Sequence, residues 1–96
     1  MVGTNDFTDC MQDLAAFVRV AEAGSFSRAA QQMAMTPSAV SRQVARLEKQ
    51  LGVRLMHRST RQLRLTDAGA DVLARGAEMV AAARAALQAR GGSTWA

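Results

Sequence analysis

The sequence predicts a mainly α fold: a winged helix-turn-helix, built from three helices and a short two-stranded wing, followed by one long helix. Three observations predict it. Apolar residues recur at helical spacing in the first half of the chain, this spacing gives way to alternation near residue 55, and a long alanine-rich helical pattern follows. With 96 residues, 49% of them hydrophobic, the chain can build one small core, so one domain is expected.

The first half of the chain begins with two helical patterns. The first helix is expected over about Gln12 to Ala23, and Gly24 follows where a left-handed cap ends a helix. Its apolar face is formed by Leu14, Phe17, Val18 and Ala21. Ser25 is a suitable N-cap for a short second helix. The apolar face of this second helix is formed by Phe26, Ala29, Ala30 and Met33.

A third helix is expected from Pro37 to Leu51. Thr36 is its N-cap, the fixed φ of Pro37 suits a first turn, and Gly52 can supply the C-cap. Its apolar face is formed by Val40, Val44, Leu47 and Leu51. Two helices joined by a short turn, with small residues where they approach, fit a helix-turn-helix. Ala34 occupies the turn, where many such motifs carry glycine.

Between Val53 and Leu65 the apolar period changes to two. On the first half of this segment Val53, Leu55 and His57 fall on one side. Such alternation predicts two short strands, and the polar residues 59–62 between them would form the tip of a basic hairpin, a wing that leans on the helices. Because the strands would be near the minimum length, an irregular loop is the alternative.

The last helix is expected from a cap at Thr66, with Asp67 in its first turn, to about Arg90, ahead of a Gly-Gly-Ser stretch. Apolar and small residues recur along it every seven residues, which favours packing against another helix. A domain this small cannot cover so long a stripe, so a second copy of the chain is the expected partner and a helix folded back on its own core is the alternative. The predicted dimerisation residues are Gly69, Val72, Leu73, Gly76, Met79, Val80, Ala83 and Leu87.

Positive charge is concentrated in one block of the chain, whose net charge is +4 overall. Residues 1–27 hold one arginine against four acids, a net −3, and residues 65–96 balance three arginines against three acids. Residues 28–64 hold eight cations against Glu48 alone, a net +7. A block of this charge suits a polyanion such as nucleic acid, and a solvated basic surface is the alternative.

The face of the third helix opposite its apolar face carries hydroxyls at its start and cations further along. A recognition helix is built in this way, because its first turns approach base edges in the major groove and an arginine can donate two hydrogen bonds to guanine. Arg42 is the candidate base reader. The hydroxyls are candidates for base or phosphate contacts and the other cations for backbone contacts, with ordinary solvation as the alternative. These residues are Thr36, Ser38, Ser41, Arg46 and Lys49.

Two arginines lie near the tip of the expected wing, Arg58 and Arg61. A guanidinium is attracted to the narrow, strongly negative minor groove, so both are candidates for that groove or for phosphates. Arg54 and Arg64 are interpreted as surface charges.

The sequence lacks the residue patterns of an enzyme. His57 is the only histidine, and no GxSxG, GxxxxGK or HExxH motif occurs. We therefore expect no enzymatic activity, no cofactor and no metal. Cys10 has no partner for an internal disulfide, and no apolar run approaches the roughly 20 residues that cross a bilayer. These features predict a soluble cytoplasmic protein, associated with the nucleoid if it binds DNA.

Several motifs in order resemble the N-terminal region of LysR-type transcriptional regulators. The matching segments are Leu14-Ala-Ala-Phe17, Ala21-Glu-Ala-Gly24-Ser-Phe26-Ser, Ala29-Ala30, Thr36-Pro-Ser-Ala-Val-Ser-Arg42-Gln, Leu47-Glu-Lys-Gln-Leu51-Gly, Arg58 and Leu65-Thr-Asp-Ala-Gly69. The resemblance covers about Met11 to Leu87. It implies a winged helix-turn-helix whose long linker helix pairs two subunits, bound to inverted-repeat operators in promoters. The positions it implies for DNA contact include Pro37, Ser38, Ser41, Arg42, Arg58 and Arg61.

The resemblance also divides the chain. We expect residues 1–10 to be a disordered extension ahead of a natural start at Met11, residues 11–65 to be the winged helix-turn-helix, residues 66–90 to be the dimerisation helix and residues 91–96 to be a flexible tail. The family's effector-binding domain would follow Ala96, so a fragment of a longer protein is expected and a naturally short chain is the alternative. A tetramer is open in a longer parent. The competing function is a helical protein-interaction module without specific DNA readout.

Overall fold

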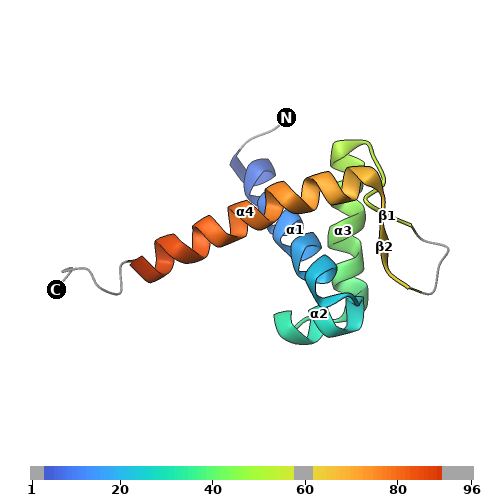
Figure 1. Ribbon diagram of the computed structural model, residues 1–96, viewed down its shortest axis with the longest axis horizontal. Helices are drawn as coiled ribbons and strands as arrows, with labels where there is room; N and C mark the ends of the chain where they lie inside the picture. Colours follow the sequence, from blue (N-terminus) through green and yellow to red (C-terminus); the bar gives the residue numbers. More distant parts are fainter. Residues whose placement is uncertain (1–3, 58–61, 90–96) are drawn as a thin grey trace.

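The computed structural model describes residues 4–57 and 62–89, which are coloured in Figure 1. Four helices and one two-stranded antiparallel sheet make up this described part. The helices are α1 (Thr4–Ala23), α2 (Phe26–Met33), α3 (Pro37–Leu51) and α4 (Asp67–Ala89), and the strands are β1 (Met56–His57) and β2 (Arg64–Leu65). The predicted fold class, a winged helix-turn-helix followed by a long helix, is confirmed.

The core lies where α1, α2 and α3 meet the beginning of the wing. The predicted apolar faces are turned inward: Phe17 of α1 and Val40 and Val44 of α3 are fully buried. The small side chains of α2 let it lie close to its neighbours, and their burial away from water stabilises the packing. The buried members of this core are Phe17, Val20, Ala29, Ala30, Val40, Val44, Leu47, Leu55 and Met56.

Caps fix the turn that joins α2 to α3. Thr36 Oγ1 accepts a hydrogen bond of 3.1 Å from the N–H of Ala39, as an N-cap does. Ala34 takes the left-handed conformation at φ 56°, and the N–H of Met35 donates to the carbonyl of Ala30 at 2.9 Å. The chain therefore makes the glycine-type turn with an alanine, so α3 leaves the turn in a fixed direction.

The first helix is longer than the sequence analysis predicts. It begins at Thr4 and not at Gln12, so residues 4–10 of the predicted disordered extension are helical. The reason lies in the spacing, because Phe7, Cys10 and Met11 stand at i, i+3 and i+4 and lead into Leu14 at i+7. The apolar face of α1 thus starts one heptad earlier than predicted.

The wing differs from the predicted alternation. The strands are two residues long and pair Met56 with Leu65 and His57 with Arg64. Leu55 and Met56 are both buried, whereas Val53 and His57 are exposed. The prediction that Val53, Leu55 and His57 lie on one side of the strand is therefore wrong. The N–H groups of Leu55 and Met56 both donate to the buried carboxylate of Glu48, at 2.8 and 3.3 Å, and this shared anchor keeps both residues at the core.

The last helix crosses α1 and then runs on beyond the body of the domain, as Figure 1 shows. Thr66 caps it as predicted, since its Oγ1 accepts a 2.9 Å hydrogen bond from the N–H of Gly69. Every residue from 81 to 89 is exposed. Within the described ranges, none of the helices is both long and apolar enough to span a lipid bilayer.

Candidate nucleic-acid interface

The third helix has two chemically distinct faces. Val40, Val44 and Leu47 are buried against the core. The opposite face is exposed along its whole length, apart from the half-buried Ser41. Because the helix is held along one side, the other side is free to enter a groove of a nucleic acid. The exposed members of this reading face are Ser38, Arg42, Ala45, Arg46 and Lys49.

Small polar groups surround the N-terminus of α3. Thr36 and Pro37 are exposed there, and the Thr36 Oγ1 lies 3.5 Å from the Oγ of the exposed Ser38. The N-terminal end of a helix carries the positive end of its dipole and unpaired N–H groups. An anion such as a phosphate therefore suits this end of the reading face.

Two cations of the reading face, Arg42 and Lys49, have no polar partner among the described residues. Among the described residues, neither side chain forms a hydrogen bond or an ion pair, and both are exposed. All donors of the Arg42 guanidinium are thus available for a planar acceptor pair such as the O6 and N7 of guanine. Lys49 stands near the C-terminal end of α3, where a point charge suits a phosphate.

Arg46 is held differently from its neighbours. Its Nε and Nη2 donate to the two carboxylate oxygens of Asp13 on α1, at 2.9 and 2.8 Å. The hydrogen bond to Asp13 and the attraction between the two charges raise the pKa of Arg46. The arginine side chain remains 57% exposed, while that of Asp13 is 4% exposed. Arg46 therefore ties α3 to α1 and still shows part of its guanidinium to solvent.

Only the base of the wing can be described. Arg54 and Arg64 are exposed there, in agreement with their interpretation as surface charges. Arg58 and Arg61, the predicted wing contacts, lie outside the described residues. Glu48 anchors the base of the wing to α3 through Leu55 and Met56, so the position of the wing depends on α3.

The predicted dimerisation residues divide into three groups along α4. Gly69 and Gly76 are buried within the chain: a Cβ on Gly69 would overlap the carbonyl group of Leu55, and a Cβ on Gly76 would lie 2.7 Å from Val18 Cγ2. These two glycines therefore serve the packing of α4 on its own domain. Half-buried side chains lie between and after these glycines, and the two predicted residues nearest the end of the helix are exposed. The half-buried residues are Val72, Leu73, Met79 and Val80, and the exposed ones are Ala83 and Leu87.

The sequence analysis does not predict the roles of two acids, Asp13 and Glu48, that hold the interface in place. Asp13 lies 33 residues from Arg46, and no local pattern signals their pairing. Glu48 had a signal, since it is the only acid in the basic block of residues 28–64. A single acid among eight cations is a candidate for a buried, hydrogen-bonded structural contact. Within residues 4–57 and 62–89, no cluster of three His, Cys, Asp or Glu side chains is placed to hold a metal ion.

Comparisons with known proteins agree with this geometry. Residues 11–70 match the family model described as "Bacterial regulatory helix-turn-helix protein, lysR family". The chain is 48% identical over 81 residues to the probable HTH-type transcriptional regulator LtrA of Klebsiella pneumoniae, covering 84% of this chain and 26% of that protein. It is 59% identical over 64 residues to the HTH-type transcriptional regulator CrgA of Neisseria meningitidis, covering 67% of this chain and 21% of that protein. The chain thus spans about a quarter of the length of these relatives or less.

Solved structures share the fold. A mutant of OxyR from Corynebacterium glutamicum superposes with a TM-score of 0.81 at 32% identity, over 88% of this chain and 27% of that one. A structure named as a complex of the BenM_DBD with catB site 1 DNA superposes with a TM-score of 0.77 at 26% identity, over 90% of this chain and 98% of that one.

Proposed function

Because the chain belongs to the lysR family of bacterial regulatory helix-turn-helix proteins, we propose that it binds duplex DNA sequence-specifically, as a homodimer on an inverted-repeat operator. In this proposal it is the DNA-binding part of a transcription regulator. The family match and the regulators among its relatives support DNA binding in transcription regulation. The likeness to a structure named as a DNA complex supports duplex DNA as the ligand.

The observation that carries the proposal is the two-faced character of α3. A helix buried along Val40, Val44 and Leu47 cannot rotate, so its exposed face is presented in one orientation. That face offers small side chains at its start, which allow close approach to the bases, followed by the unpaired Arg42. In our proposal α3 lies in the major groove and Arg42 reads a guanine.

The other contacts serve to place the helix. Phosphates accept hydrogen bonds from the N-terminal end of α3 and contact its remaining cations, which fixes the register without reading sequence. Arg58 and Arg61 would extend the contact to the minor groove beside the recognition helix. The proposed positioning residues on α3 are Thr36, Pro37, Ser38, Ser41, Arg46 and Lys49.

The homodimer is proposed from α4. Its free end carries Ala83 and Leu87 on a stretch, residues 81–89, in which every residue is exposed. A second copy that pairs with this helix around a two-fold axis places two recognition helices in opposite orientations, and an inverted repeat has the matching symmetry. The relatives are named as transcriptional regulators, which favours a non-enzymatic role. In our proposal the chain acts in the cytoplasm, at the nucleoid.

The exposed end of α4 also favours a second candidate, a helical interaction module without specific DNA readout. One experiment separates the two functions: selection of bound sequences from a random duplex library by the purified chain at physiological salt. Specific binding predicts enrichment of an inverted repeat, with half-sites about one helical turn apart. Binding without enrichment would reduce the proposal to a basic duplex binder, and no binding would favour the interaction module.

A further inference from the structure

The ion pair with Asp13 occupies only one edge of the Arg46 guanidinium. Nε and Nη2 donate to the two carboxylate oxygens, at 2.9 and 2.8 Å. Because the guanidinium is planar, the N–H groups of Nη1 and the second N–H of Nη2 point away from Asp13 as a fork of donors. Among the described residues no other acceptor bonds to Arg46, and its side chain is 57% exposed. Arg46 can therefore bind a second anion while it keeps the first.

The pair lies at the edge of the reading face that borders α1. Arg46 stands one helical turn after Arg42 on α3, and its partner Asp13 belongs to α1. Base edges lie in the floor of the major groove, and the sugar–phosphate backbones border it. A cation at the edge of a helix in this groove therefore faces a phosphate.

Asp13 is an acid beside a surface proposed to bind DNA. Its side chain is 4% exposed. By charge alone this carboxylate opposes the binding of a phosphate. A side chain that is already fixed has the contrary effect, because less rotamer freedom is lost when the complex forms. The two effects of Asp13 on DNA affinity have opposite signs, so experiment can separate them.

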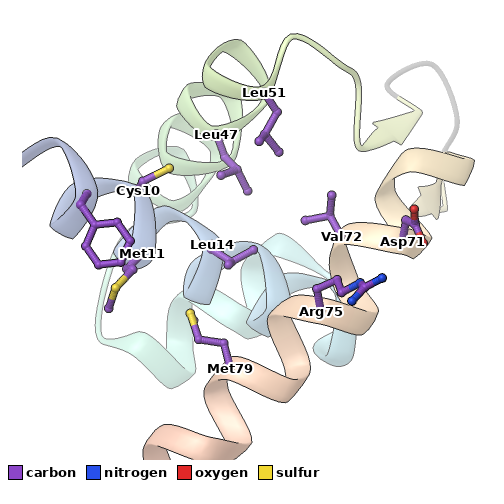
Figure 2. Close-up of a pocket in the computed structure, with 10 residues that line it drawn as sticks. Cys10, Met11, Leu14, Leu47, Leu51, Asp71, Val72, Arg75 and Met79 are labelled. Atoms are coloured by element: carbon purple, nitrogen blue, oxygen red, sulfur yellow. The ribbon is translucent and has the colours of Figure 1, made fainter. Parts of the chain in front are cut away.

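Apolar packing holds α1 against α3 directly beside the pair. Leu14 follows Asp13 in the sequence. Leu47 follows Arg46, and Figure 2 shows it with Leu14 around the same hollow between the helices. The backbone that carries Arg46 is thus held by packing as well. The freedom that remains is the rotation of the arginine side chain, and a two-point contact with Asp13 restricts it.

We propose that Asp13 is a positioning residue for DNA binding: it holds Arg46 so that the free fork of the guanidinium binds one phosphate in each half-site. The inference rests on the proposed DNA-binding function. The ion pair persists in the complex, since the carboxylate and the phosphate use different edges of the guanidinium. Arg42, which has no polar partner among the described residues, stays free to adjust to a base edge.

The variant Asp13→Asn tests the proposal, and Asp9→Asn is its matched control. Both variants remove one negative charge from α1, and the two positions are one helical turn apart. Asp9 is exposed and acts on Arg46 through its charge alone. Asparagine has nearly the size of aspartate and can still accept one hydrogen bond from Arg46. Affinities are measured on the inverted repeat that the parent chain selects from a random duplex library.

We expect Asp13→Asn to weaken binding about threefold, the size of effect expected when one long side chain is immobilised on binding. The control Asp9→Asn should bind as tightly as the parent or more tightly. If Asp13→Asn binds as tightly as Asp9→Asn, the carboxylate acts only through its charge and the proposal is overturned.

Neutral methylphosphonate linkages, introduced one at a time, locate the phosphate. In the parent chain one linkage in each half-site should lower the affinity about tenfold, as for a lost hydrogen bond to a charged group, and in Arg46→Gln this loss should disappear. In Asp13→Asn the loss at the same linkage should shrink to about threefold. A merely structural role of Asp13 leaves the full loss at this linkage in the variant, which would contradict the proposal.

A measurement on the parent chain tests the proposal even if Asp13→Asn does not fold. The Nε–H signal of Arg46 is assigned in a nuclear magnetic resonance spectrum by its absence in Arg46→Gln. This proton should exchange with water more slowly than the Nε–H proton of Arg42 in the free protein, and it should stay protected on DNA. Equal exchange of the two protons in the free protein, or loss of protection on DNA, would overturn the proposal.

The inference and the proposed function fail in different ways. A parent chain that enriches no inverted repeat would overturn the proposed function and the inference together. A parent chain that selects an inverted repeat, with Asp13→Asn no weaker than Asp9→Asn, would overturn the inference while the proposed function stands.

Discussion

The guanidinium of Arg46 on α3 and the carboxylate of Asp13 on α1 form a two-point ion pair, with donor–acceptor distances of 2.9 and 2.8 Å. The pair is asymmetric, since the acid is buried and the base is largely exposed. A bidentate contact restricts rotation as well as distance. It therefore fixes the orientation of α3 on α1, and with it the direction in which Arg42 and Ser38 point.

The asymmetry predicts unequal effects of the two single substitutions. Arg46→Met should lower the free energy of unfolding by about 2–3 kcal/mol, because it leaves the carboxylate of Asp13 buried without its partner. Asp13→Ala should cost about 1 kcal/mol, because Arg46 is then solvated. Urea unfolding of both variants measures the difference. Equal costs, or a larger cost for Asp13→Ala, would contradict the assigned burial.

The same pair predicts different salt effects on DNA binding. Neutralisation of one phosphate contributes about −0.9 to the slope of log K against log salt concentration. Lys49→Ala should therefore flatten the slope by about 0.9. Arg46→Ala should flatten it by less, because Asp13 already neutralises part of its charge. Binding titrations over a range of salt concentrations measure both, with Arg84→Ala on the exposed end of α4 as the control that leaves the slope unchanged.

The glycines of α4 provide a test of how this helix sits on its own domain. Gly69→Ala should destabilise the chain by about 2–3 kcal/mol, since the added methyl meets the backbone of Leu55, which cannot move aside. Gly76→Ala should cost less, because the nearest atoms belong to the side chains of Val18 and Leu14 and can shift. Thermal unfolding at several protein concentrations gives both values. A stabilising Gly69→Ala would place this residue on an open face.

The turn of the helix-turn-helix stores a small strain that substitution can release. Ala34 is left-handed at φ 56°, a conformation that costs an alanine about 1–2 kcal/mol. Ala34→Gly removes that cost, but the larger conformational entropy of glycine in the unfolded chain lowers the free energy of unfolding by about 0.5–1 kcal/mol. The net result expected is a stabilisation of about 0.5 kcal/mol. Chemical denaturation measures it. A loss of stability would contradict the left-handed turn.

The elements with strong local signals could be predicted from the sequence. Thr36-Pro37 at its start and Gly52 at its end define α3, and the observed bounds Pro37–Leu51 agree with the prediction. Hydrogen bonds of Ser25, Thr36 and Thr66 confirm the three predicted N-caps. In each case the determining interaction spans only a few residues, so the pattern is visible along the chain.

The parts that could not be predicted depend on contacts between distant residues. The pairing of Asp13 with Arg46 and the anchoring of Leu55 by Glu48 arise only when the helices pack. The same holds for Gly69, which is predicted at a dimer interface but packs against the backbone of Leu55 in its own chain. The helical spacing that begins at Phe7 is present in the sequence. The prediction omits it because residues 1–10 are expected to be an extension ahead of a natural start of the protein at Met11.

The role of Arg42 is the most direct test of the central claim that α3 reads base sequence. Parent and Arg42→Ala chains are each used to select bound duplexes from the same random library, and affinities are then measured for single-base variants of the selected site. The account predicts that Arg42→Ala loses about 1–3 kcal/mol of preference at one base pair in each half-site and keeps the other preferences. An equal loss of affinity on every sequence, with all base preferences intact, would show that Arg42 contacts only the backbone and would contradict the account.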